Sequence, residues 1–359
     1  MGSYYKSLSF LFASCIMLCH SIHSYGASTD TVTKRTSNVR VLPVPAFGST
    51  PETGAYLGVF SLFTLDFYKD SLTRPSNAKA EFDYTWKKQM IFESSWNYFF
   101  KHEKWYTQGQ LHYSKFIDLY FGIGENTAGS SETRYQVNRL IANVNLLKKI
   151  GNRLFVGPKV VLKDYSKLKY FTSIQYPELA NGKNLGLGLT VLKDTRNNLL
   201  NASRGIYLEF TNVYNFLDSR YTKIIIDGRT YKTVIAKTVG SIRFYNEFTA
   251  GNPLFYDYAL IGSDKVVRGY YYGRFRDKIL STLQGEIRRQ LVGRFGAAIF
   301  GGITKIYPDL RELTLANLKP NYGLGLRFLI DRKNNINLRL DYGFGQGDDG
   351  FYVMFGESF

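Results

Sequence analysis

The chain has 359 residues, enough for one large domain or two ordinary ones. Its 28 Tyr, 27 Phe and 33 Gly, against only 9 Pro, favour a fold of many strands over a helical one. The net charge of +17 is compatible with nucleic acid, an anionic lipid surface or an acidic ligand as partner, and charge alone does not choose among them.

The first 26 residues have the features of a secretory signal peptide. Lys6 precedes an apolar run from Leu8 to Cys19, and the small residues Ser24 and Gly26 predict cleavage after Gly26. A membrane anchor is one alternative, but the run is shorter than the ~20 apolar residues that span a bilayer. A lipoprotein-type cut at Cys15 is a second alternative.

Cleavage would remove both cysteines, Cys15 and Cys19, so the mature chain is expected to form no disulfide. Only His102 and His112 follow the signal peptide, which excludes zinc sites built on cysteine. We therefore expect no metal and no cofactor. Because the chain also has no G-x-S-x-G nucleophile motif, we expect that it is not an enzyme.

Residues 27–53 contain the polar stretch "STDTVTKRTSN" and are predicted to be a short periplasmic segment. Residues 54–359 are predicted to form a single domain. After residue 20 no run of ~18 apolar residues occurs, so a transmembrane helix is not expected. A closed β-barrel is the other structure that can cross a membrane.

Alternating segments predict such a barrel. In "NINLRLDYGF", residues 335–344, apolar side chains fall on one face and polar or glycine residues on the other. A soluble β-sandwich also alternates, but the export signal favours an all-β, 16-stranded antiparallel transmembrane barrel. The predicted strands are 54–68, 78–86, 89–100, 104–115, 119–124, 133–149, 152–164, 184–195, 205–216, 220–232, 234–249, 278–291, 294–305, 320–331, 335–345 and 350–359.

The last predicted strand, "GFYVMFGESF", ends the chain on an aromatic residue. It resembles the C-terminal strand of bacterial outer-membrane barrels, which the barrel assembly machinery reads during insertion. The residues predicted to share its lipid-facing side and to form this assembly signal are Phe351, Val353, Phe355 and Phe359.

Three patterns in order resemble the barrel of the BamA/TamA superfamily, of the bacterial surface antigen type, over roughly residues 40–359. They are "GLGLTVLKDTRNNLLNASRGIYLEF" (186–210), "VRGY" (267–270) and the C-terminal "GLGLRF … NLRLDYG … FYVMFGESF". The family's usual Pro before the glycine of the first pattern is absent; Ala202 and Ser203 stand near its place. The matching positions are Asp194, Arg196, Asn197 and Gly205 in the first pattern and Val267, Arg268, Gly269 and Tyr270 in the second.

The resemblance implies that the loop carrying "VRGY" folds back into the lumen, where acidic residues on the wall hold its arginine. Arg268 matches the loop arginine, and Glu286 matches the acid on the twelfth strand. On the thirteenth strand Gly301 stands about where a second acid is expected, so Asp341 is the candidate replacement. A bidentate arginine–carboxylate pair is strong and directional, which makes such a clamp physically reasonable.

The resemblance also implies a place in the outer membrane of a Gram-negative bacterium and a role in inserting or translocating proteins or lipids there. The segment before the first predicted strand is too short for POTRA domains, so a POTRA-containing or lipoprotein partner is expected. The surplus positive charge is expected to face lipopolysaccharide phosphates, and export removes a nucleic-acid role. The alternative function is a passive or gated pore that prefers anions because Arg288, Arg327 and Arg339 line it.

Overall fold

The computed structural model describes residues 38–50, 54–68, 70, 72–172, 176–264 and 266–359, so the predicted signal peptide lies outside the described residues. Sixteen strands form one antiparallel sheet in which each strand pairs with its neighbour along the chain. This confirms the all-β, 16-stranded prediction. In the described ranges, no helix combines the length and the apolar character needed to cross a membrane.

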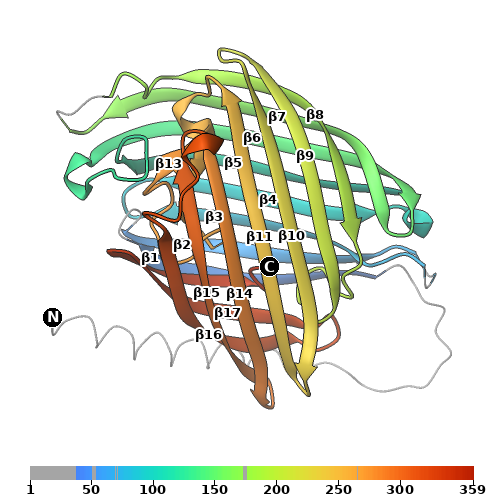
Figure 1. The fold of residues 1–359 in the computed structure, drawn as a ribbon. Coiled ribbons are helices and arrows are strands. Elements are labelled where there is room, and N and C mark those ends of the chain that lie inside the picture. Colours follow the sequence, from blue (N-terminus) through green and yellow to red (C-terminus); the bar gives the residue numbers. More distant parts are fainter. Residues whose placement is uncertain (1–37, 51–53, 69, 71, 173–175, 265) are drawn as a thin grey trace, which may run out of the picture. The chain divides into compact units, whose positions relative to one another are not determined.

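Strands follow one another from the start of the described chain almost to its C-terminus (Figure 1). Their bounds are β1 Asn38–Thr50, β2 Gly54–Asp66, β3 Ser76–Thr85, β4 Met90–Phe99, β5 Trp105–Tyr120, β6 Thr133–Gly151, β7 Leu154–Tyr170, β8 Gly182–Asp194, β9 Gly205–Leu217, β10 Tyr221–Ile235, β11 Thr238–Gly251, β14 Ile279–Val292, β15 Phe295–Tyr307, β16 Lys319–Asp331, β17 Ile336–Gly345 and β18 Asp348–Phe355. A separate two-stranded sheet joins β12 (Ala259–Leu260) to β13 (Arg276–Asp277).

The side chains alternate as a membrane barrel requires. On β16, Tyr322 and Leu324 are 63% and 64% exposed, whereas Asn321 and Arg327 on the same strand are buried. Apolar side chains thus cover the outside and polar ones fill the inside. This is the reverse of a soluble sandwich, whose apolar faces point inward.

Because the strands are antiparallel and in chain order, successive connections lie at opposite ends of the sheet. We call one end the turn end; its connections are 67–75, 100–104, 152–153, 195–204, 236–237, 293–294 and 332–335. We call the other the loop end; its described connections are 86–89, 121–132, 171–181, 218–220, 252–278, 308–318 and 346–347.

The predicted boundary of the barrel is wrong at its start. Residues 38–50, assigned to a short periplasmic segment, form β1 and pair with β2 along their whole length. Pro43 and Pro45 lie within β1, and proline is tolerated there because only one side of this strand is paired in the sheet. The predicted strands 104–115 and 119–124 are a single strand, β5. The predicted number of sixteen is still correct, because the strand that was missed, β1, offsets the strand that was divided, β5.

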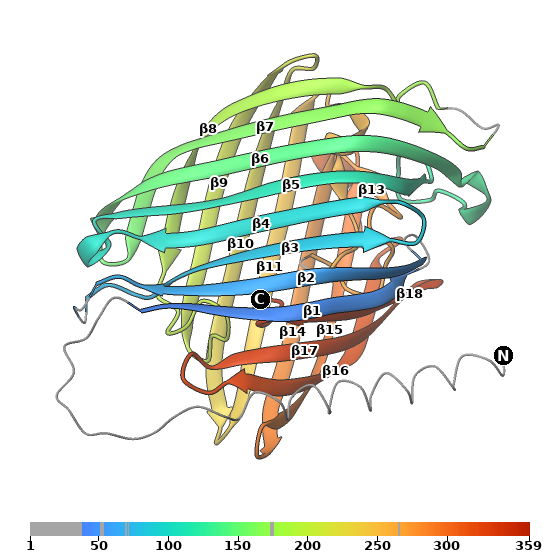
Figure 2. The same cartoon turned by 180° about the vertical axis from the view of Figure 1, so that it is seen from behind.

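The first and last strands of the sheet approach each other at a seam (Figure 2). Phe60 of β2 stacks on Phe355 of β18, with ring centroids 4.3 Å apart. Phe60 also belongs to a buried apolar cluster with Leu62 and Ile336, against which Leu200 packs. Side-chain packing therefore joins the two ends of the sheet.

Candidate functional site

The connection 252–278 folds into the lumen, as the resemblance implied. Val267 is fully buried and packs in an apolar cluster with Tyr270 of the same loop and with Leu280 and Ile306 of the wall. Arg268 and Tyr270 are 1% and 2% exposed. The tip of this loop is therefore a packed part of the barrel interior.

Arg268 lies between the two carboxylates named from the sequence. Its Nη2 is 2.8 Å from Oε2 of Glu286 on β14, and its Nη1 donates to the Asp341 carboxylate on β17. Both carboxylate side chains are fully buried. A buried arginine with two carboxylate partners is a strong, directional restraint on the loop.

Three more arginines join this cluster and balance its charge. Arg327 contacts Oδ1 of Asp341 at 2.6 Å and Oε2 of Glu357 at 2.7 Å. Arg339 contacts Asp341 at 3.0 Å and Asp264 at 3.3 Å. Arg288 lies 3.5 Å from Glu286. Among the described residues, four arginines thus meet four carboxylates, and their charges balance.

The clamp position on β15 is occupied by Phe300, which corrects the alignment made at Gly301. Phe300 pairs opposite Glu286 and is buried, so it points into the lumen, and the adjacent Gly301 points outward because side chains alternate. The Arg268 guanidinium lies 3.5 Å from the Phe300 ring centroid. A cation–π contact therefore stands at the wall position nearest the predicted second acid.

Close contacts seat the loop tip on β16, β17 and β18. Gly269 has a positive φ of 99° and lies so close to the backbone of Phe344 that a Cβ would clash. Its N–H donates to the Tyr352 hydroxyl at 2.9 Å. The Tyr270 hydroxyl donates to the carbonyl of Pro320 at 2.7 Å. Gly269 is thus required by the fit of the loop against the wall.

A second anchor holds the same loop near the loop end. Asp257 accepts hydrogen bonds from Lys163, from Tyr221 at 2.6 Å and from Asn184 at 3.2 Å. Burial alone would raise the pKa of Asp257, but the charges of Lys163 and Lys223 outweigh it and hold that pKa below its ordinary value. Sequence reasoning missed Asp257, because nothing local marks its partners on β7, β8 and β10.

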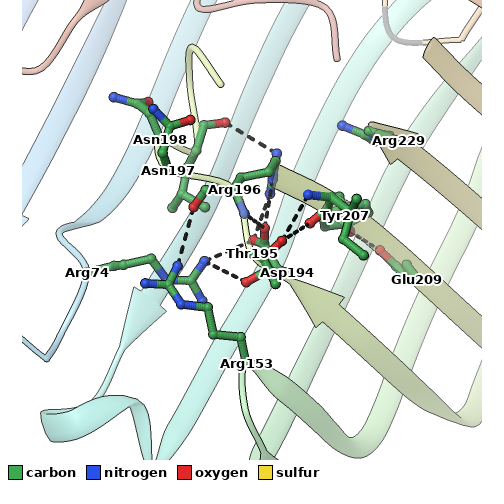
Figure 3. A network of polar contacts seen from close by, with 12 residues as sticks. Arg74, Arg153, Asp194, Thr195, Arg196, Asn197, Asn198, Tyr207, Glu209 and Arg229 are labelled. Carbon is green, nitrogen blue, oxygen red and sulfur yellow. Dashed lines mark hydrogen bonds and ion pairs between the residues drawn. The ribbon is translucent and has the colours of Figure 1, made fainter. Parts of the chain in front are cut away.

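The sequence motif of the β8–β9 connection forms a polar network at the turn end (Figure 3). Asp194 binds Arg196 in a bidentate pair with distances of 2.9 and 3.0 Å, and Arg74 lies 3.3 Å from the same carboxylate. Arg74 also pairs with Glu103 at 2.8 Å. The motif therefore ties three connections of the turn end together.

The other motif residues shape the connection itself. Asn197 accepts hydrogen bonds from the backbone N–H of Ser203 and Arg204, at 2.9 and 3.1 Å, which closes the loop 195–204 on itself. Gly205 has a φ of 106°, and a Cβ there would collide with the backbone of Thr195. Both residues are therefore local structural requirements of this loop.

The loop 195–204 also extends across the turn end to the seam. The carbonyl of Leu200 accepts the Glu357 N–H at 2.8 Å, and Asn198 donates to the carbonyl of Asn334 at 2.9 Å. Arg288 on β14 donates to the carbonyl of Ala202. Sequence reasoning missed this role, although the apolar pair Leu199–Leu200 within a polar turn is a usable signal.

The four residues of the predicted C-terminal signal do not all share one face in the structure. Phe351 and Val353 are exposed on the outer face, and Phe355 is half-buried at the seam. Phe359 is not on that face: the strand ends at Phe355, Gly356 takes a φ of 82°, and Phe359 is buried. Its ring lies 6.0 Å from the guanidiniums of Arg243 and Arg268, because the chain turns inward at Gly356.

His112 has two partners in the lumen wall. Its Nδ1 is 2.9 Å from Glu93 and its Nε2 is 3.0 Å from the Ser114 hydroxyl. Ser114 is only 2% exposed, so a substrate has no access to its hydroxyl. The contacts of His112 are therefore structural contacts within the barrel wall. Among the residues that the structure describes, no group of three or more His, Cys, Asp or Glu is placed to hold a metal ion.

Comparisons with known proteins agree with this architecture. The model of the Omp85 superfamily domain matches residues 72–359, which confirms the predicted resemblance. Similar solved structures include BamA from Haemophilus ducreyi lacking POTRA domains 1-3 (10% identity, TM-score 0.54, covering 90% of this chain and 69% of that chain) and CdiB from Acinetobacter baumannii (13%, 0.56, 88% and 59%). At these identities the likeness shows the fold alone. No curated protein matches the sequence.

Proposed function

This chain belongs to the Omp85 superfamily, and on that premise we propose that its barrel helps to insert or translocate proteins or lipids at the outer membrane of a Gram-negative bacterium. We further propose that it acts through the seam between its first and last strands. Its own insertion would use the barrel assembly machinery, and a POTRA-containing or lipoprotein partner would deliver the client. The chain spans 59% of the length of CdiB.

The observation that carries this proposal is a contrast between the lumen and the seam. The tip of loop 252–278 is clamped inside the lumen, whereas Phe60, Phe355 and Leu200 join the seam through side chains. Pro43 and Pro45 fall on alternate residues of β1 and have no N–H to donate. Because β1 pairs fully with β2, the missing donors belong to its other edge, which weakens any ladder toward β18.

The alternative of an anion-preferring pore loses its basis in this geometry. It depended on Arg288, Arg327 and Arg339 as a basic lining, but each pairs with buried carboxylates and none exceeds 5% exposure. A paired, buried arginine presents no net charge to a passing ion. Loop 252–278 also occupies the path beside them.

A reversible lock on the seam tests the proposal. The chain after residue 26 has no cysteine, so Phe60→Cys with Phe355→Cys introduces one defined pair across the seam. The matched control is Phe295→Cys with Phe328→Cys, which joins directly paired residues of β15 and β16 whose rings are 5.1 Å apart. Each variant is expressed in cells depleted of the wild-type protein, and the outer-membrane proteome and surface lipids are measured.

We expect the oxidised seam pair to reproduce the depletion defect, a reductant to reverse it, and the control pair to complement in both states. Equal complementation by the oxidised seam pair and the control would contradict a role for the seam. If depletion itself changes no resident barrel and no surface lipid, the assembly function fails as well.

A further inference from the structure

The exposed charges of the barrel are distributed unequally between its two ends. Among the described residues, ten exposed Lys and Arg side chains lie at the turn end against one exposed acid, Asp66. Among the described residues of the loop end, nine exposed Lys and Arg stand against five exposed Asp and Glu, and further acids there are half-exposed. Most of the unbalanced positive charge therefore lies at the turn end, and not at the loop end, where lipopolysaccharide was expected to meet it.

The turn-end cations are spread round the sheet. They begin at Arg40 on β1 and recur at the hairpins that follow β4, β6, β8, β10, β14 and β16. In the described part of the chain none of the ten has an ion-pair partner. Six of them, one or two per hairpin, are Lys104, Lys148, Lys237, Arg289, Arg332 and Lys333.

Exposed apolar side chains lie among these cations at the tips of the hairpins. Ile150, Ile235 and Val292 are 58%, 59% and 72% exposed within a few residues of Lys148, Lys237 and Arg289. Apolar tips of this kind are stable when immersed in the edge of a bilayer. The neighbouring cations then lie at the depth of the lipid headgroups.

We propose that the turn end is a collar that binds the phosphates of anionic phospholipids. In outer-membrane barrels the short turns face the periplasm, so this collar meets the inner, phospholipid leaflet. Lys and Arg near an anionic leaflet are attracted to its headgroups, and their apolar stems suit the interface. This inference goes beyond the proposed function and holds whether or not the seam opens.

The layout favours lipid over an acidic protein as the occupant. A protein partner would need a cluster on one side or across the mouth, whereas these cations follow the perimeter with apolar tips between them. Lys148 lies 6.0 Å from the ring centroid of Trp105, which is 40% exposed. Such a pair of cation and indole is suited to the membrane interface.

Trp105 offers a local probe of this collar. With Trp86→Phe and Trp96→Phe, it is the one remaining tryptophan of the three in the chain. The protein is reconstituted in phosphatidylcholine vesicles, and its fluorescence is measured while brominated phosphatidylglycerol or brominated phosphatidylcholine replaces the host lipid. At equal mole fractions of brominated lipid, the quenching by phosphatidylglycerol is divided by the quenching by phosphatidylcholine. This quenching ratio gives the preference of the collar for the anionic lipid.

We expect a preference of at least about fivefold, the effect of one basic residue near an anionic surface. Changing the six turn-end cations to Gln should bring the ratio close to one. The control changes four Lys and two Arg at the loop end, none of which forms an ion pair with another described residue, and should leave the ratio unchanged: Lys88, Lys115, Lys167, Lys169, Arg220 and Arg311, each to Gln.

A ratio near one for the unmodified collar overturns the proposal, as does an equal loss in both six-residue variants. Capture of an acidic protein by the turn end without any lipid preference would also overturn it in favour of that partner. Heat-dependent gel migration verifies that each variant is folded. If the six-residue variant does not fold, Lys104→Gln with Lys148→Gln, which flank Trp105, is used and must lower the ratio.

Discussion

The guanidinium of Arg268 lies 3.5 Å from the centre of the Phe300 ring, while its two carboxylate partners approach from β14 and β17. The aromatic ring thus takes the place on β15 where the family pattern suggested a second acid. A further carboxylate beside Arg268 would be the fifth acid of a cluster that now balances four arginines with four acids, and would give it a net negative charge. Phe300 stabilises the arginine without that excess.

Replacing this ring tests its share of the clamp. Phe300→Leu keeps an apolar side chain but removes the cation–π contact, which we expect to weaken docking of loop 252–278 by about 2 kcal/mol. The readout is the rate of limited proteolysis within the loop, in the folded protein. Phe351→Leu, at an exposed position on β18, should leave that rate unchanged. Equal rates for Phe300→Leu and the wild type would remove Phe300 from the clamp.

Removing the arginine should have a larger effect. Arg268→Ala leaves Glu286 and Asp341 with one positive charge fewer in a buried cluster, and we expect docking to weaken by about 3–5 kcal/mol. The barrel should still insert and show heat-dependent gel migration, because the strand ladders do not depend on Arg268. Arg268→Lys should fall between, since it keeps the charge but not the fork. Unchanged protease sensitivity of the loop in Arg268→Ala would refute the clamp.

The turn-end network offers a separate test of stability. Asp194→Asn leaves Arg196 without its carboxylate and Arg74 with Glu103 alone, so we expect a loss of about 3 kcal/mol in the free energy of unfolding. The measurement is urea unfolding of the barrel in vesicles. Asp66→Asn, at an exposed carboxylate of the same end, is the control and should be neutral. A similar loss in both variants would mean that the network contributes nothing specific.

Leu200 is expected to hold the seam from the turn end. Leu200→Ser removes its apolar contact with the cluster of Phe60, Leu62 and Ile336, and should destabilise the barrel by about 1–2 kcal/mol. The midpoint of heat-dependent gel migration reports the change. Leu72→Ser, at a 66% exposed site in another turn-end connection, serves as the comparison. Should both variants shift the midpoint equally, Leu200 has no special role at the seam.

Acid should release the Asp257 anchor. Its pKa in the folded state lies below its ordinary value, so its contribution is complete above the ordinary aspartate pKa of about 3.9 and is lost as pH falls through the lower, folded pKa. We expect pepsin to cut loop 252–278 faster as the pH is lowered below about 4. Asp257→Asn should be cut readily over the whole range. A wild-type profile that matches the variant would exclude this anchor.

Several features of the fold could be predicted from the sequence, some from local patterns and some from the family resemblance. Period-two alternation in segments such as 335–344 predicted the barrel, because strand side chains alternate between two faces whatever they pair with. Arg268 and Glu286 could be named together because the family resemblance implies this pair, and Asp341 because alternation places its carboxylate on the inward face of its strand. The glycines at 205 and 269 could be singled out because they stand at glycine positions of the family motifs, where a tight backbone needs them.

Other features were decided only by the tertiary structure. A shift of one residue exchanges the two faces of a strand, so Phe300 rather than Gly301 meets Arg268. The partners of Asp257 and Leu200 come from strands far away in the sequence, and no local pattern encodes such contacts. Phe359 belongs to the lumen because the chain turns at Gly356. The sequence alone determined which side chains alternate and which charges need partners. The pairing of the strands and the folding of the loop into the lumen decided which partners they meet.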